Sequence, residues 1–269
     1  MTTAPGIPLT APGIGYAVSG AAATLTLSNP ARLNAMTAGM WAAIPGHIAA
    51  AEKDPAVRIV IIRGEGTKAF SAGADISEFE TSRTGDAARH YNDLNHAAFE
   101  AIQRISKPTA AMIHGPCLGG GLAIAACCDL RIADEAATFA IPAARLGIGY
   151  DPRWVRPLLQ VLAPPRVKEI LFTARRISAQ EALAMGLVNR VVPADELAAA
   201  VGSLASDIAA NAPLTLRAAK ASIDMLARRP ESADLAALDR LVADCFASGD
   251  YAEGCRAFLE KRKPEFRGR

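Results

Sequence analysis

The sequence predicts an α/β fold that ends in a region made only of helices. Short β-branched apolar runs alternate with longer stretches of helical periodicity over most of the chain, and such alternation is typical of a sheet joined by right-handed crossovers. The strand pattern then stops near residue 195. The 269 residues are 51% hydrophobic, which is enough for a sizeable core.

Each predicted strand is a short apolar run between polar or turn-forming residues. Residues 57–64, VRIVIIRG, are the clearest case, because a continuous β-branched run is typical of a strand buried on both faces. The predicted strands are 14–19, 23–28, 57–63, 109–114, 130–133 and 188–192.

Helical periodicity places helices between and after these strands. The predicted helices are 37–53, 86–105, 120–128, 153–162, 164–174, 178–186, 194–211, 213–228, 231–247 and 250–262. Pro45 falls inside the first of them and predicts a kink or a break there. The helices after residue 195 cannot bury their apolar faces alone, so we expect them to pack on the core or on a neighbouring subunit.

Composition excludes several classes of protein. A net charge of +2 argues against nucleic-acid binding. The sequence contains no run of eighteen apolar residues, so no membrane span is expected, and residues 1–12 lack the pattern of a signal peptide. The number of cysteines, five, is odd, and no paired Cys-x-x-Cys spacing occurs, which predicts reduced, packed thiols in a cytoplasmic protein. No metal-binding motif is present, so no metal is expected.

A glycine-rich segment follows the predicted strand at 109–114. Residues 115–122 read GPCLGGGL, and an apolar helix begins within them. Glycines at a helix start leave main-chain N–H groups uncovered, where the helix dipole adds positive potential. Such a site can hold a phosphate or the negative oxygen that develops on a reacting carbonyl. A tight turn before a packed helix explains the same pattern.

A second segment of small residues follows the strand at 57–63. Residues 69–76 read AFSAGADI, and the small side chains around Gly73 let the main chain approach a ligand closely. If N–H groups from both segments face one carbonyl oxygen, they form an oxyanion hole.

The pairing of AFSAGADI with HGPCLGGG, in this order, resembles the crotonase superfamily of enoyl-CoA hydratases and isomerases. The resemblance extends to residues 28–35, 176–188 and 258–262. It implies a crotonase-like spiral of ββα turns over residues 1–195 and a helical trimerisation region over 196–269. It also implies an acyl-CoA thioester as substrate, no tightly bound cofactor, and a homotrimer or a hexamer.

The resemblance also assigns functions to particular residues. It implies that the N–H groups of Ala74 and Gly120 form the oxyanion hole. The implied coenzyme A contacts are Arg32, Ala72, Asp75, Ile76, Leu118, Phe258 and Lys261. Phe258 and Lys261 match family residues that reach the coenzyme A of a neighbouring subunit. Lys261 also fits simple charge complementarity at a helix C-terminus.

Two positions depart from the hydratase pattern. Hydratases of this family carry one glutamate two residues after the glycine triplet and another in a Phe-x-x-Pro-Glu segment. Those positions are Ala123 and Ala143 here. Adding water across a double bond needs a base for the water and a proton donor for the α-carbon. Without either carboxylate, we do not expect efficient hydration by the usual route.

Asp151 is the remaining candidate for acid/base catalysis. Dienoyl-CoA isomerases of the family have an aspartate at a matching offset in the same loop. The sequence Asp151-Pro152 is also typical of a helix start, with the aspartate as N-cap, and the two roles are compatible. The adjacent Tyr150 is a candidate polar donor to the substrate.

Three functions therefore stay open at the level of sequence. The favoured one is a double-bond isomerase in which Asp151 moves a proton on a thioester enolate. The second is an acyl-CoA decarboxylase or another lyase, and the third is an acyl-CoA-binding protein without catalysis. Tyr91, Phe99, Met112 and Trp154 are candidate pocket walls, although each also fits an ordinary core position.

Overall fold

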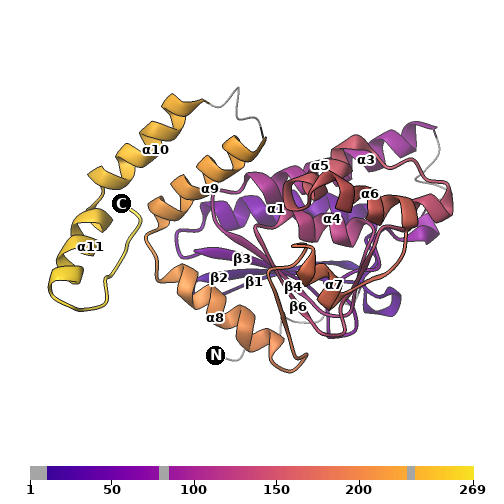
Figure 1. Cartoon of the computed structure of the whole chain (residues 1–269), viewed down its shortest axis with the longest axis horizontal. Helices are drawn as coiled ribbons and strands as arrows, with labels where there is room; N and C mark the ends of the chain where they lie inside the picture. Colours follow the sequence, from indigo (N-terminus) through magenta and orange to yellow (C-terminus); the bar gives the residue numbers. More distant parts are fainter. Residues whose placement is uncertain (1–10, 79–84, 229–233) are drawn as a thin grey trace.

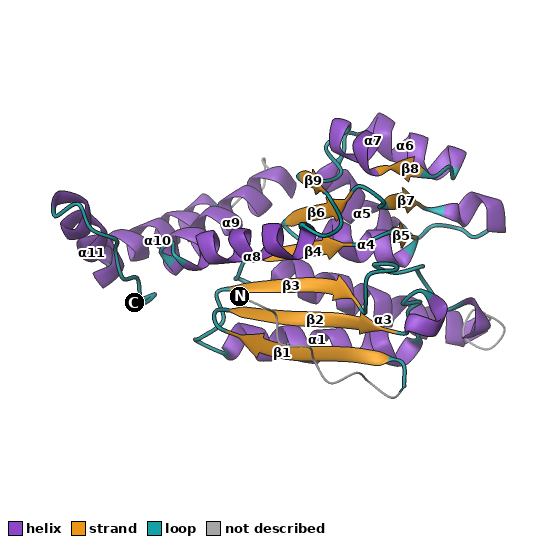
Figure 2. Cartoon of the chain, turned by 90° about the horizontal axis from the view of Figure 1, so that it is seen from below, coloured by secondary structure: helices purple, strands orange, loops and turns teal. Residues whose placement is uncertain are grey.

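A six-stranded sheet organises the computed structural model, which describes residues 11–78, 85–228 and 234–269. Its order is β1-β2-β3-β4-β6-β9, and β1 and β2 form the antiparallel pair at one edge of an otherwise parallel sheet (Figure 2). The strands are β1 (Gly13–Ser19), β2 (Ala22–Ser28), β3 (Ile59–Gly64), β4 (Thr109–Ile113), β6 (Leu130–Asp134) and β9 (Arg190–Val192). All six predicted strands are confirmed, with small differences at their ends.

A second, three-stranded sheet was not predicted. Its strands are β5 (Pro116–Leu118), β7 (Thr138–Ala140) and β8 (Ile177–Ser178), in the order β5-β7-β8. Each of β5 and β7 follows a strand of the large sheet after a few residues, so the chain passes from the large sheet to the small one. After β5 the chain enters a helix, which completes one ββα turn. Runs of two or three residues are too short to show periodicity.

Helices cover one face of the large sheet (Figures 1 and 2). They are α1 (Ala38–Lys53), α3 (Gly85–Arg104) and α4 (Gly120–Cys127). Helix α5 (Pro152–Val161) packs on α4, α6 (Pro164–Thr173) packs on α5, and α7 (Ala179–Ala184) lies beside the small sheet. The main apolar core lies between these helices and the sheet. Helix α1 continues through Pro45, so the predicted break is absent.

Helix α8 (Leu197–Ala209) covers part of the opposite face of the sheet (Figure 1). Its Leu197, Val201 and Ala205 are four residues apart and therefore share one helix face. They pack against apolar residues of β3, β4 and β6, including Met112, in a smaller core cluster. Helix α8 thus lies after residue 196 and still packs on the sheet. The division of the chain into two regions at residues 195 and 196 stays a prediction.

The C-terminal arm consists of α9 (Pro213–Arg228), α10 (Leu235–Ala247) and α11 (Gly249–Leu259). Figure 1 shows α10 and α11 extending away from the sheet and its covering helices. Lys220 of α9 ties the arm to the core, since its Nζ donates to Asp129 Oδ2 (2.8 Å) and to the Lys107 carbonyl (3.0 Å). Among the described residues no single helix is long and apolar enough to span a membrane; only α8 and α9 together pass that test, across a 104° bend.

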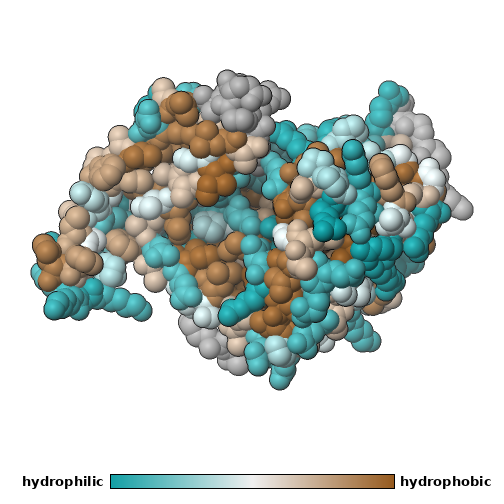
Figure 3. All heavy atoms as spheres, viewed as in Figure 1, coloured by the Kyte–Doolittle hydropathy of each residue, from teal (hydrophilic) through white to brown (hydrophobic). Residues whose placement is uncertain are grey.

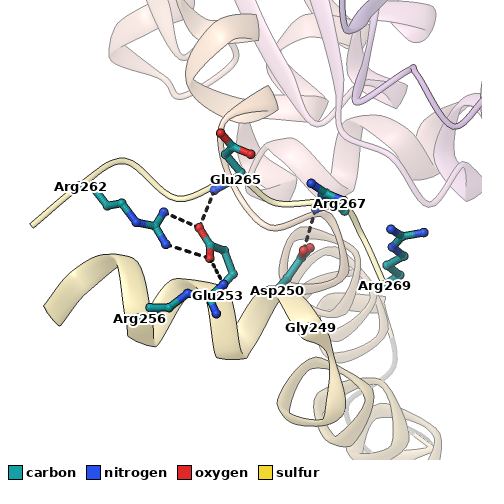
Figure 4. Close-up of a pocket in the computed structure, with 8 residues that line it drawn as sticks. All are labelled: Gly249, Asp250, Glu253, Arg256, Arg262, Glu265, Arg267 and Arg269. Carbon is teal, nitrogen blue, oxygen red and sulfur yellow. Dashed lines mark hydrogen bonds and ion pairs between the residues drawn. The ribbon is translucent and has the colours of Figure 1, made fainter. Parts of the chain in front are cut away.

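The chain end folds back onto the arm (Figure 4). The buried carboxylate of Asp250 accepts from the main-chain N–H groups of Arg267 (2.6 Å) and Gly268 (2.7 Å). Glu253 pairs with Arg262 and also accepts from the N–H of Glu265 (3.1 Å). Two acidic side chains of α11 therefore hold the last residues in place.

Candidate active site

Main-chain hydrogen bonds bring the two small-residue segments side by side. The N–H groups of Phe70 and Ser71 both donate to the Pro116 carbonyl at 3.1 Å, and Leu118 N–H donates to the Ser71 carbonyl at 2.9 Å. The loop after Ser71 is therefore fixed against the start of α4. A methyl group built on Gly120 would lie 3.8 Å from the nitrogen of Ala74.

The peptide between Gly73 and Ala74 has a defined direction. The Gly73 carbonyl accepts from Met36 N–H at 2.7 Å. Because the carbonyl and the N–H of a trans peptide point in opposite directions, the N–H of Ala74 points away from Met36. Gly73 has φ +95°, a conformation that favours glycine, and a Cβ there would lie 2.9 Å from the Leu118 carbonyl oxygen.

The peptide between Gly119 and Gly120 is oriented by the helix that it begins. The Gly119 carbonyl accepts from Ala123 N–H at 3.1 Å and therefore points along α4. The N–H of Gly120 consequently points out of the N-terminal end of the helix. Within the described residues, neither this N–H nor that of Ala74 has a hydrogen-bond acceptor.

A cavity of about 140 Å³ lies at this place and contains both residues in its wall. The wall comes from α1, the loop of residues 72–76, α3, the start of α4, the segment 141–150 and the start of α5. Its residues are Trp41, Ala72, Gly73, Ala74, Ile76, Asn95, Phe99, Gly119, Gly120, Ala123, Ile141, Pro142, Ala143, Leu146, Ile148, Tyr150 and Trp154. Ile76 and Leu146 are exposed apolar residues in this wall. Exposed apolar side chains that lie together often mark a ligand-binding site.

The described wall of the cavity carries no charged side chain. Both positions where hydratases have glutamate, Ala123 and Ala143, lie in this wall as methyl groups. Burial raises the pKa of the Tyr150 hydroxyl, so it stays protonated at neutral pH and can donate a hydrogen bond. The cavity thus offers main-chain donors and a phenol, but no carboxylate among its described lining.

Residues 18–269 match the protein family described as Enoyl-CoA hydratase/isomerase. The chain belongs to this family. It is therefore a member of the crotonase superfamily, as the sequence motifs predicted, and its α/β fold is the crotonase fold.

Named relatives and solved structures of the family are similar over most of their length. The crotonyl-CoA hydratase of Syntrophomonas wolfei is 37% identical over 248 residues, which cover 91% of this chain and 94% of that protein. A crystal structure described as an enoyl-CoA hydratase/carnithine racemase from Magnetospirillum magneticum has a TM-score of 0.92 and 38% identity, covering 95% of this chain and 96% of that one. A putative enoyl-CoA hydratase/isomerase family protein from Hyphomonas neptunium has a TM-score of 0.92 and 39% identity, covering 98% of this chain and 100% of that one.

Asp151 lies beside the cavity but is not part of its described wall. It is the N-cap of α5, and its Oδ1 accepts from Arg153 N–H at 2.8 Å. Its Oδ2 pairs with the Arg153 guanidinium at 2.8 Å. The hydrogen bond from the Arg153 side chain is the main reason that the pKa of Asp151 is lowered. The carboxylate is therefore charged at neutral pH and engaged by a neighbouring cation.

The residues assigned to coenzyme A fall into three places. Ala72 and Ile76 line the cavity, whereas Arg32, Asp75 and Leu118 are not in its described wall. The half-exposed Arg32 pairs with Asp75 at 2.7 Å. Burial raises the pKa of Asp75, but hydrogen bonds from Ser77 and Arg32 outweigh it and the pKa is lowered. Phe258 and Lys261 belong to the arm, and Phe258 is 84% exposed.

Part of the cavity wall could be predicted from the sequence, and part could not. Phe99 and Trp154 line the cavity, as predicted. Tyr91 is buried beside it and accepts from Trp41 Nε1 at 2.9 Å, and Met112 packs under α8 instead. Trp41 and Asn95 were not predicted. A signal existed for Asn95, because it is polar and sits between Tyr91 and Phe99 at four-residue spacing on an apolar helix face.

Proposed function

We propose that this protein binds an acyl-CoA thioester with the thioester oxygen between the N–H groups of Ala74 and Gly120. Those two donors stabilise the enolate that forms when the α-carbon gains negative charge. The observation that supports the proposal is that Ala74 and Gly120, whose N–H groups have no acceptor in the described residues, both lie in the wall of one uncharged cavity. Loss of one such donor in other enzymes slows the reaction about 100- to 1000-fold.

The coenzyme A part is proposed to lie along the loop of Ala72, Asp75 and Ile76, with Leu118 beside it and Arg32 near the phosphates. Arg32 is half-exposed and already oriented by Asp75, which supports a contact with a phosphate at the surface. Phe258 and Lys261 are proposed to reach the coenzyme A of an adjacent subunit, which their place on the extended arm supports. Coenzyme A enters as part of the substrate, and no further cofactor is proposed.

Among the possible reactions, we favour isomerisation of a double bond over hydration. Relatives named as hydratases favour hydration, but Ala123 and Ala143 supply neither the base nor the proton donor. Asp151 follows Tyr150, which lines the cavity, and is proposed to move the proton between carbon atoms of the acyl chain. This requires the Asp151 carboxylate to leave Arg153 and turn toward the cavity.

Decarboxylation is the second candidate, and the uncharged wall favours it. A carboxylate on the acyl group is destabilised where no cation lines the cavity. Its loss as carbon dioxide passes the electron pair of the broken carbon–carbon bond to the thioester, which becomes the enolate held by Ala74 and Gly120. Solvent then protonates the α-carbon, so no strong protein base is needed.

Isotope exchange separates these reactions. The full-length protein is incubated in heavy water with 3-butenoyl-CoA, crotonyl-CoA or malonyl-CoA, and products are followed by NMR. Isomerisation predicts conversion of the 3-enoyl thioester to the 2-enoyl thioester with deuterium at the γ-carbon, and exchange of the α-protons of the remaining substrate into heavy water. Both are expected to be lost in Asp151→Asn. Carbon dioxide release from malonyl-CoA supports decarboxylation, and tight binding with neither event supports a non-catalytic binding protein. Rapid hydration of crotonyl-CoA contradicts the interpretation of Ala123 and Ala143.

We also propose that the protein forms a homotrimer or a hexamer through the C-terminal arm. In Figure 3 apolar residues gather over the arm. Phe246, Phe258 and Leu259 are each more than half exposed, which is unfavourable for an isolated chain.

The five unpaired cysteines support a cytoplasmic location, where thiols stay reduced.

A further inference from the structure

One polar side chain in the cavity wall has no function in the proposed reaction. Asn95 of α3 lines the cavity and is only 4% exposed. Its Nδ2 is buried without a hydrogen-bond partner. Its Oδ1 also takes part in no hydrogen bond within the described residues. Because buried amides are nearly always hydrogen-bonded in native proteins, an idle one in a cavity indicates a missing partner.

The position of Asn95 in the helix is one that packing alone would give to an apolar residue. Tyr91, Asn95 and Phe99 lie four residues apart and therefore share one face of α3. Trp41 is in contact with both neighbours, since it donates to the Tyr91 hydroxyl and its ring meets Phe99 edge-on, 5.5 Å between centroids. Leucine would fill such a place without leaving polar atoms unpaired.

We propose that Asn95 is a specificity-determining residue that selects acyl groups carrying a neutral oxygen function, a hydroxyl or an oxo group. This inference rests on the proposed function, since it assumes that the cavity holds the acyl chain. A carboxamide can donate to either group through Nδ2 and can accept from a hydroxyl through Oδ1. An unsubstituted acyl chain leaves the amide unpaired and is therefore bound less tightly.

The charge of the cavity decides that the oxygen function is neutral. The described wall contains no Lys, Arg or His, so a carboxylate at the far end of the acyl chain has no counter-ion there. Tyr150 supplies a second neutral group in the same wall, and its ring is fixed edge-on against Trp154, 5.4 Å between centroids. Asn95 and Tyr150 thus both suit an uncharged oxygen.

Binding measurements on matched ligands test this inference. Calorimetric titration compares hexanoyl-CoA with its 3-, 4- and 5-hydroxy and 3- and 5-oxo derivatives, on the wild type and on Asn95→Leu. The wild type is expected to bind at least one oxygenated ligand about tenfold more tightly than hexanoyl-CoA. Asn95→Leu is expected to abolish this preference while keeping hexanoyl-CoA affinity, and to raise Tm by about 2–4 °C because an unpaired amide is removed.

Gln103→Leu is the matched control, because it removes an amide from the same helix outside the cavity wall. It is expected to keep the preference. If wild type binds hexanoyl-CoA but prefers no oxygenated derivative, the inference on Asn95 is overturned and the proposed function stands. The same holds if Asn95→Leu keeps the preference. If no acyl-CoA binds to wild type, the proposed function itself fails, and the inference fails with it.

Discussion

At the scale of single residues, the proposed chemistry depends on main-chain groups and on the absence of side chains. Gly73 lets its peptide turn the N–H of Ala74 away from Met36, and Gly119 and Gly120 leave the start of α4 open. Ala123 and Ala143 put methyl groups where other members of the family carry carboxylates. In the proposed function, this scaffold stabilises an enolate with fewer acids and bases nearby.

Replacing Gly73 with alanine tests the assignment of the Ala74 N–H. A Cβ at this position would lie 2.9 Å from the Leu118 carbonyl oxygen and 3.3 Å from the nitrogen of Gly120, at φ +95°. The loop must shift, so the rate of α-proton exchange or of carbon dioxide release is expected to fall about 100-fold. Gly66→Ala is the control, because Gly66 has φ +67° with no atom within 4 Å of the built Cβ.

The control should lose about 1 kcal/mol of unfolding free energy and keep its activity, since alanine is strained in the left-handed region. Full activity in Gly73→Ala, with a melting temperature showing that it is folded, would remove Ala74 from the proposed oxyanion hole.

The pair of Asp151 and Arg153 predicts a pH dependence of stability. The pKa of Asp151 is lowered in the folded protein, chiefly by the Arg153 hydrogen bond. Its stabilising effect is therefore complete above the unfolded pKa, about 4, and is lost as the pH falls through the folded pKa. Asp151→Asn keeps the helix cap but removes the charge. Wild type should be more stable by about 0.5 kcal/mol at pH 7, and the difference should vanish in acid.

Urea unfolding of both proteins between pH 2 and pH 7 measures this difference. A gap that widens in acid, or that is already absent at neutral pH, would mean that the ion pair does not stabilise the folded state.

At the scale of elements, the length of a strand determined whether it could be predicted from the sequence. The β3 run IVII is long and β-branched, so its burial on both faces could be predicted. Strands β5 and β8 contain three and two residues, and they exist because their neighbours in space complete their hydrogen bonds. Helix α1 continues through Pro45 because packing of Trp41, Ile44 and Ile48 on the core outweighs the lost hydrogen bond.

The start of α11 and the last residues of the chain form a contact that can be tested alone. Asp250 accepts from Arg267 and Gly268, so Asp250→Ala leaves both N–H groups without their acceptor. Hydrogen exchange at these two amides is expected to become at least tenfold faster, with little change in the core strands. Mass spectrometry of exchanged peptides measures this. Asp239→Ala on the exposed face of α10 is the control, and equal exchange in the two variants would contradict the role of Asp250.

At the scale of the whole molecule, the arm is the part whose packing is incomplete. Val242 and Phe246 of α10 are 43% and 63% exposed. If they lie between subunits, the double variant Val242→Glu and Phe246→Glu should be monomeric where wild type is trimeric or hexameric, because like charges would be buried together. Analytical ultracentrifugation measures the mass. Leu159→Glu on α5 is a control of similar exposure, at 47%.

A wild type that sediments as a monomer at micromolar concentration would refute this assembly. So would an unchanged mass in the double variant, provided that its helical content matches that of wild type.

The site was more predictable from the sequence than its selectivity. Ala72, Ala74, Gly120, Ala123 and Ala143 belong to motifs with fixed spacing, and all of them line one cavity. The contribution of Asn95 depends on which helix face turns inward and on what Trp41 already occupies. Such information arises from packing between distant segments, and a single sequence does not display it.

The face of the sheet beneath α8 limits how this protein can be shortened. Leu197, Val201 and Ala205 shield Ile61 and Met112 from water. A fragment that ends after β9 would therefore expose a broad apolar surface and aggregate. A truncation that keeps this face covered has to begin after Ala209, well beyond Trp154, the last residue of the described cavity wall.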